Sequence, residues 1–148
     1  MLKLLLLLPL AGVLMVGCAA SPPSGINNQG RLAPCPGSPN CVTSEGEDAD
    51  MACIPFSGPP AAAMERMAAV LKSFRNADVV EREDNYMRAE FKSTVFGFVD
   101  DVEIRLDDRQ GCLHFRSASR SGYWDFGVNK KRMKLVRERF TAESSDQT

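Results

Sequence analysis

Apolar and polar residues alternate along much of the second half of the chain, and this alternation predicts β-strands. In the segment 86–95 every second side chain except Ser93 is apolar, and the same period runs through 101–107 and 112–117. Shorter strands are expected at 51–56 and 79–82, each bounded by turn-forming residues. The pattern predicts an antiparallel sheet with one apolar face and one charged face.

Two other segments repeat their apolar residues at helical spacing. The first follows Pro59-Pro60, which a helix tolerates in its first turn, and its apolar stripe is Met64, Met67, Ala68, Leu71 and Phe74. The last helix is expected from Asn129 to about Phe140, with Met133 and Val136 on its buried side. The order β-α-β-β-β-β-α predicts an α+β domain, a single curved antiparallel sheet with two helices on one face. This order resembles the TATA-binding-protein-like and helix-grip architectures, a likeness of shape that carries no function.

The N-terminus has the features of an export signal. Lys3 precedes an apolar run, Leu4–Val16, that is too short to span a bilayer comfortably. The run ends in Leu14-Met15-Val16-Gly17-Cys18, which resembles the bacterial lipobox, although Met15 replaces the usual Leu or Val. We therefore expect a signal peptide over 1–17 and acylation of Cys18. An uncleaved anchor or an ordinary secretory signal is the alternative.

An acylated Cys18 would make the lipid bilayer the first partner of this protein. By resemblance to bacterial sorting rules, Ala19 predicts the outer membrane, facing the periplasm, if the source has two membranes. A flexible tether over 18–30 and an irregular Pro- and Cys-containing segment over 31–50 are expected next. The α+β domain is expected over 51–141, followed by a disordered tail over 142–148.

Composition narrows the function classes. With 148 residues, 25% of them charged, and a net charge of −1, the chain suits one globular domain and gives no indication of a nucleic-acid partner. Five cysteines fit an oxidising compartment. Once Cys18 is acylated, the other four allow three pairings, of which we favour Cys35–Cys41, closing a Pro-rich loop, and Cys53–Cys112, joining two strands. No C-x-x-C spacing occurs, which disfavours a zinc or redox site.

The stretch 116–132 is the main candidate for a binding site. A strand ends there, a loop rich in Ser, Gly and aromatic residues follows, and a helix then begins with basic residues. Helix N-termini combined with Arg and Ser donors bind anions. This predicts a phosphate or carboxylate site built from Arg116, Ser119, Arg120, Tyr123, Asp125, Asn129 and Arg132. Alternatively, Arg116 and Arg120 pair with Asp100, Asp101 or Asp125 and only fix the loop.

The aromatic residues of this loop, Tyr123, Trp124 and Phe126, also allow two interpretations. They could cap one end of the core, which we favour. If they are exposed together, they would mark a surface for a ligand or partner.

Three stretches together resemble a known family. They are 32–44, reading LAPCPGSPNCVTS; 98–103, reading FVDDVE; and 116–132, reading RSASRSGYWDFGVNKKR. The sequence resembles, over about residues 32–140, the bacterial family of domains of unknown function numbered 1499. This resemblance implies no activity, cofactor or site.

The function expected from the sequence is a non-enzymatic envelope lipoprotein that binds an anionic ligand or an envelope protein through the 116–132 loop. The alternative is a structural or assembly lipoprotein without a ligand site. An enzyme is disfavoured, with no metal or cofactor expected, because no set of nucleophile, base and acid and no metal cluster can be named in the sequence. The lone His114 is interpreted as solvated surface. Adjacent Asp100 and Asp101 should point to opposite faces of their strand and so should not act as a pair.

Overall fold

In a computed structural model, the chain is described over residues 21–23, 25–46, 49, 51–94 and 96–145. The expected signal peptide, the acylation site Cys18 and the sorting residue Ala19 all lie outside the described residues.

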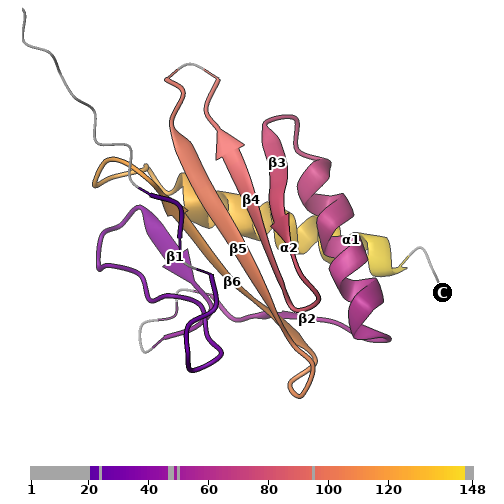
Figure 1. Ribbon diagram of the computed structural model, residues 1–148. Helices are drawn as coiled ribbons and strands as arrows, with labels where there is room; N and C mark the ends of the chain where they lie inside the picture. Colours follow the sequence, from indigo (N-terminus) through magenta and orange to yellow (C-terminus); the bar gives the residue numbers. More distant parts are fainter. Residues whose placement is uncertain (1–20, 24, 47–48, 50, 95, 146–148) are drawn as a thin grey trace, which may run out of the picture.

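Six strands form one antiparallel sheet in the order β1-β6-β5-β4-β3, and β2 pairs separately with β6 (Figure 1). The strands are β1 (Cys41–Thr43), β2 (Ile54–Pro55), β3 (Ala77–Arg82), β4 (Tyr86–Lys92), β5 (Val99–Asp107) and β6 (Cys112–Ser119). The predicted alternation and the predicted α+β class are confirmed.

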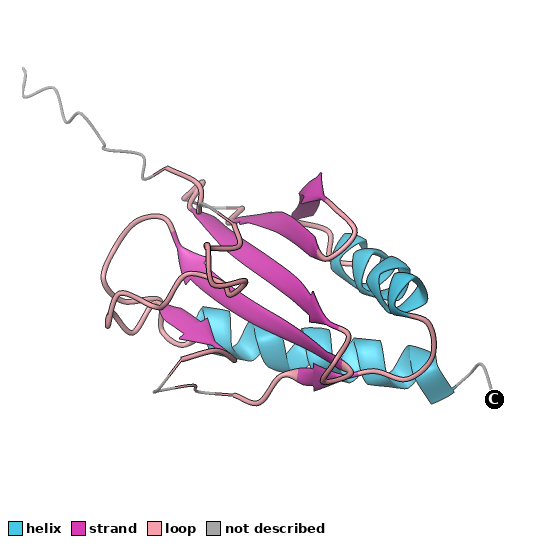
Figure 2. Cartoon of the chain, turned by 60° about the horizontal axis from the view of Figure 1, so that its bottom comes forward, coloured by secondary structure: helices cyan, strands magenta, loops and turns pink. Residues whose placement is uncertain are grey.

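Two helices, α1 (Pro60–Lys72) and α2 (Val128–Ser145), lie on the same side of the sheet (Figure 2). The apolar residues that alternate along the strands pack against the apolar stripes of these helices. The core contains Met67, Leu71, Met87, Phe91, Val102, Ile104, Leu113, Phe115, Met133 and Phe140, each buried. The predicted order β-α-β-β-β-β-α is confirmed, because β2 and the later elements follow it in sequence.

Strand β1 lies in the segment 31–50, which we expected to be irregular. Its residues pair with β6, so that Cys41 lies opposite Ala118 and Thr43 opposite Arg116. All three residues of β1 are buried, and a strand of three residues is too short to show an alternating pattern. Conversely, only Ile54 and Pro55 of the strand expected over 51–56 pair with the sheet.

Both favoured disulfides are present. Cys35 and Cys41 close the loop before β1, with Cα atoms 5.7 Å apart. Cys53 and Cys112, with Cα atoms 5.9 Å apart, join the residue before β2 to the first residue of β6. The second disulfide therefore connects residues 59 positions apart in the sequence.

The two ends of the sheet carry different loops. At the end drawn uppermost in Figure 1, here called the upper end, α1 leads into β3, β4 turns into β5, and the loop 120–127 leads from β6 to α2. The N–H of Arg120 donates to the carbonyl of Val99 (3.0 Å), so the loop 120–127 begins beside the start of β5. The opposite, lower end carries the turns 83–85 and 108–111.

Candidate functional site

The charged face of the sheet is largely shielded from solvent. Parts of residues 21–46 lie against it: the N–H of Leu32 donates to the Glu45 carboxylate (2.6 Å), and that carboxylate in turn accepts from Arg105 on β5. Glu103 and Asp101 on this face are 0% and 1% exposed. The interpretation of His114 on this face as solvated surface is wrong, because His114 is only 9% exposed.

Arg116 neutralises the most deeply buried carboxylate of this face. Its Nη1 donates to Glu103 Oε2 (3.0 Å), and the hydroxyl of Tyr86 donates to Glu103 Oε1 (3.0 Å). Burial nevertheless raises the pKa of Glu103, and burial together with the neighbouring Glu103 carboxylate raises the pKa of Tyr86. The guanidinium of Arg116 therefore compensates a charge that has no access to water.

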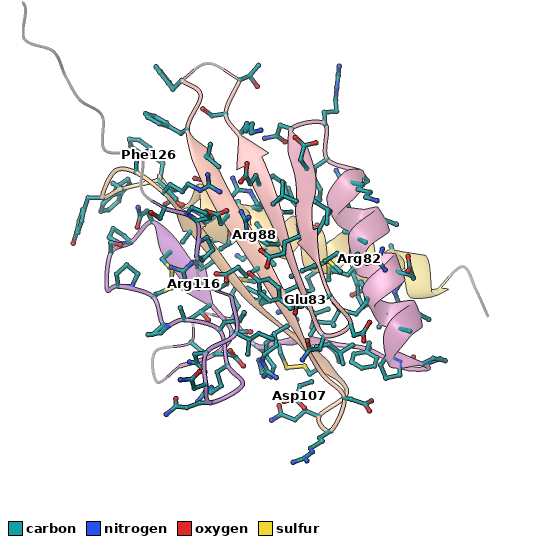
Figure 3. All side chains as sticks on the ribbon, in the orientation of Figure 1. Arg82, Glu83, Arg88, Asp107, Arg116 and Phe126 are labelled. Carbon is teal, nitrogen blue, oxygen red and sulfur yellow. A yellow bond between two sulfur atoms is a disulfide. The ribbon has the colours of Figure 1, made fainter. Side chains whose placement is uncertain are left out.

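Arg120 belongs to a second ion-pair cluster on the same face. Its Nε donates to Asp101 Oδ2 (2.7 Å) and its Nη2 to Glu90 Oε1 (2.6 Å), while Arg88 donates to the same two carboxylates. The hydrogen bond to Asp101 raises the pKa of Arg120, and the hydrogen bond from Arg120 lowers the pKa of Glu90. Figure 3 shows Arg88 and Arg116 near the middle of this face.

A different network joins the start of α2 to β6 and β1. The Asp125 carboxylate accepts from the backbone N–H groups of Gly127 (2.9 Å) and Asn129 (2.8 Å). The side-chain amide of Asn129 donates to the carbonyl of Asn40 (3.0 Å), to Ser119 Oγ (3.1 Å) and to Asp125. Asn129 is completely buried, and its hydrogen bonds fasten the start of α2 to the end of β6 and to Asn40, 89 positions away in the sequence.

Arg132 extends this network toward β5. Its Nη1 donates to Asn129 Oδ1 (2.5 Å), and its Nη2 donates to Asp100 Oδ2 (2.6 Å). Its guanidinium also lies over the ring of Phe91, 4.6 Å from the ring centroid. Asp100 thus pairs with Arg132 and Asp101 with Arg120, on opposite faces of β5 as the sequence predicted.

The structure divides the residues proposed as an anion site into separate groups. Ser119, Asp125, Asn129 and Arg132 come together at the start of α2, whereas Arg116 and Arg120 lie on the charged face with their own carboxylates. Tyr123 belongs to neither group, because its side chain is exposed. The division follows from the pleat, since successive residues of β6 point to opposite faces.

The helix N-terminus that could attract an anion already holds a carboxylate. Asp125, in the turn before α2, accepts a hydrogen bond from the N–H of Asn129 in the first turn of the helix, where a negative charge is favourable. The guanidinium groups of Arg116, Arg120 and Arg132 each contact a carboxylate within 3.0 Å. A phosphate bound to any of these three arginines would have to displace a carboxylate of the same chain.

His114 has neighbours that the sequence did not reveal. Its Nδ1 lies 3.3 Å from Ser44 Oγ and 3.8 Å from a carboxylate oxygen of Glu45, and Arg105 binds the same Glu45. Burial lowers the pKa of His114, against the effect of Glu45, which favours the protonated ring. No signal in the sequence indicated this cluster, because residues 44 and 114 meet only through β1 pairing with β6.

The Ser44–His114–Glu45 cluster does not have the arrangement of a hydrolytic triad. Such a triad uses one ring nitrogen for the nucleophile and the other for the orienting acid, whereas here both neighbours face Nδ1. His114 Nε2 is buried without a hydrogen-bond partner. Ser44 Oγ also accepts the N–H of Phe115 (2.8 Å) and so helps fix the segment after β1 to β6.

Aromatic side chains gather at the upper end of the sheet. In the loop 120–127, Tyr123, Trp124 and Phe126 are exposed, to 70%, 64% and 83%. Phe96 and Phe98 in the β4–β5 loop are also exposed and stack with ring centroids 5.7 Å apart. Figure 3 shows Phe126 at the margin of the molecule. The prediction that the loop aromatics cap the core is wrong, and the alternative of joint exposure is observed.

Among the described residues, no group of three or more His, Cys, Asp and Glu side chains is placed to hold a metal ion. Within the same part of the chain, no helix combines the length and apolarity needed to cross a membrane.

Comparison with known proteins gives a family and no activity. A model described as "Protein of unknown function (DUF1499)" matches residues 31–140. The chain belongs to the DUF1499 family. The match includes β1 and ends within α2, so it covers nearly all of the DUF1499 sheet and its helices. No curated protein and no solved structure matches the chain.

Proposed function

We propose that this DUF1499 protein is a lipoprotein of the cell envelope that acts by binding rather than by catalysis. The sequence around Cys18 supports the anchor, because it resembles a lipobox after an apolar run of signal-peptide length. The two disulfides support a compartment outside the cytoplasm, because disulfides persist in oxidising environments. In a cell with two membranes, Ala19 favours the outer membrane facing the periplasm.

One observation carries the binding function: the exposed aromatic side chains of the loop 120–127 and of the adjacent β4–β5 loop. Aromatic rings supply large apolar contact areas, and a cluster left in solvent is typical of an interaction surface. We therefore assign binding to the surface formed by Phe96, Phe98, Tyr123, Trp124 and Phe126, here called the aromatic surface.

The internal ion pairs favour contact through this surface over capture of a small anion. Arg116, Arg120 and Arg132, the arginines of the expected anion site, each hold a carboxylate of the same chain. Releasing Glu103 from Arg116 would leave a fully buried carboxylate without its cation, at a cost of several kcal/mol. Anion binding would thus work against the fold.

A mass-spectrometric measurement tests the anchor. The protein produced in a bacterium should begin at Cys18, and its first peptide should carry the mass of the acyl chains. Cys18→Ser should abolish this modification and release the protein from membranes, whereas the control Ser21→Ala should retain both. An intact Met1 or an unmodified Cys18 thiol would show that the anchor is absent.

Photocrosslinking in membranes tests the binding function. A photoreactive phenylalanine analogue at position 124 should crosslink to an envelope component, lipid or protein. The same analogue at Arg109, an exposed residue in the turn at the lower end, is the matched control and should give none. Equal products at both positions, or none at either, would favour the structural alternative without a binding surface.

A further inference from the structure

The aromatic surface lies where the described chain begins. Ser21 and Pro23 line one shallow groove together with Ser119 and Arg120, next to the loop 120–127. Figure 1 shows the first described residues at the upper end of the sheet. Cys18 precedes Ser21 by three residues, which span at most about 10 Å when fully extended. An acyl anchor at Cys18 would therefore keep the upper end close to the bilayer.

Exposed positive charge accompanies the aromatic rings. Exposed basic residues lie at this end of the sheet, at and just after the end of α1, at the end of β4 and in the first turn of α2: Lys72, Arg75, Lys92, Lys130 and Lys131. The exposed carboxylate there, Asp78, lies 3.9 Å from Lys92. The lower end instead carries Glu83, Asp84, Asp107 and Asp108, together with Arg82 and Arg109. Basic residues near a membrane are attracted to anionic headgroups.

The backbone at Phe126 gives a third observation. Among the described residues, Phe126 is the only non-glycine residue with a positive φ, 55°. A bulky side chain in the left-handed region is strained, and such strain is concentrated at functional positions. Phe126 is 83% exposed, so its ring makes little contact within the protein. The strained backbone thus holds the Phe126 ring in solvent, where a binding partner could contact it.

From these observations we infer that the upper end docks on an anionic bilayer surface, with the aromatic surface inserted at the level of the headgroups. Trp124 and Tyr123 suit this zone, because their rings leave water while their polar atoms remain hydrated, and the three Phe rings add apolar surface. The inference rests on the proposed acylation of Cys18 and adds an orientation to it. The acyl chains hold the protein at the membrane, and the two aromatic loops fix which end faces the lipid.

The chain offers a direct probe, because Trp124 is its single tryptophan. The full acylated protein is reconstituted in vesicles of phosphatidylethanolamine and phosphatidylglycerol, with and without bromine on the lipid acyl chains. We expect a blue-shifted Trp124 emission that brominated lipids quench. The matched control, Trp124→Phe combined with Arg109→Trp, moves the probe to the lower end and should show neither effect.

Mass spectrometry of the same vesicles separates the two proposals. Acylated protein with quenched Trp124 supports both the anchor and the docking. Acylated protein in which Trp124 is quenched no more than the probe at position 109 overturns the docking and leaves the anchor intact. An unmodified Cys18 overturns the proposed function, and with it the premise of the docking.

Discussion

The buried pair Glu103 and Arg116 shows how single residues on the charged face of the sheet affect the stability of the protein. The Glu103 side chain is fully buried and has two hydrogen-bonding side chains, Arg116 and Tyr86. Burial already raises the pKa of Glu103, so a lost partner would leave an unfavourable charge in a site without water. Arg116 is therefore part of the fold rather than a free ligand for an anion.

Arg116→Met should lower the free energy of unfolding by about 3–5 kcal/mol, because it leaves the Glu103 carboxylate buried and without its cation. Urea unfolding at neutral pH measures this loss. Arg109→Met, in the exposed turn before β6, removes the same charge and should change stability by less than about 0.5 kcal/mol. Similar values for the two variants would contradict the proposed role of Arg116.

The single histidine gives a prediction for pH dependence. Burial, together with the nearby Arg105, lowers the pKa of His114 and outweighs Glu45 and Asp107, which raise it. The fold thus favours the neutral ring. Stability should fall as the pH drops through about 6.5, where the unfolded chain takes up the proton, toward the lower pKa of the folded state.

An NMR titration of His114 measures that pKa without interference from another imidazole. We expect a midpoint below about 6.5, and a weaker loss of stability between pH 7 and pH 5 in His114→Gln. A midpoint at or above the ordinary histidine value would contradict the assigned environment.

At the scale of elements, Asn129 fastens β1 to the start of α2. Its amide contacts the Asn40 carbonyl, Ser119 and Asp125, while its carbonyl oxygen accepts from Arg132. Asn129→Ala should destabilise the protein by about 1–3 kcal/mol, because buried polar groups lose their partners. Amide hydrogen exchange should accelerate most in β1. Lys134→Ala on an exposed position of α2 is the control, and equal effects of the two changes would rule out this fastening role.

The two disulfides close loops of very different length. Cys35 and Cys41 are 6 positions apart, and Cys53 and Cys112 are 59 positions apart. On chain-entropy grounds, replacing the second pair by serine should cost about 4 kcal/mol, and replacing the first pair about 2 kcal/mol. Thermal or urea unfolding of the two double variants measures the difference. A larger loss for the Cys35–Cys41 pair would contradict it.

The elements show what the sequence could predict and what it could not. Strands β4, β5 and β6 alternate over seven to nine residues, and the stripe from Met64 to Leu71 repeats at helical spacing, so their patterns are unambiguous. Strand β1 has three residues and no period. The sequence pattern does not show that parts of the segment 21–46 lie against the charged face. The burial of Glu103 and His114 therefore could not be predicted from it. The pairing of Arg120 with Asp101 was among the alternatives expected from the sequence, whereas Arg116 pairs with Glu103, a carboxylate that was not among those considered.

At the scale of the whole molecule, the sheet has two unlike ends. The upper end carries the aromatic surface, exposed basic residues and the first described residues of the chain. The lower end carries short polar turns. A protein acylated at Cys18 would need no further contact merely to remain attached to a membrane. The proposed docking instead gives the domain a fixed orientation, in which the lower end faces away from the lipid.

The most direct test of this orientation maps lipid contacts on the unaltered protein. Membranes containing the acylated chain and a photoreactive phospholipid are irradiated, and crosslinked peptides are identified by mass spectrometry. The crosslinks should concentrate in the loops 93–98 and 120–127 and in the first turn of α2. Crosslinks concentrated in the turns 83–85 and 108–111, or spread evenly over both ends, would contradict the docking.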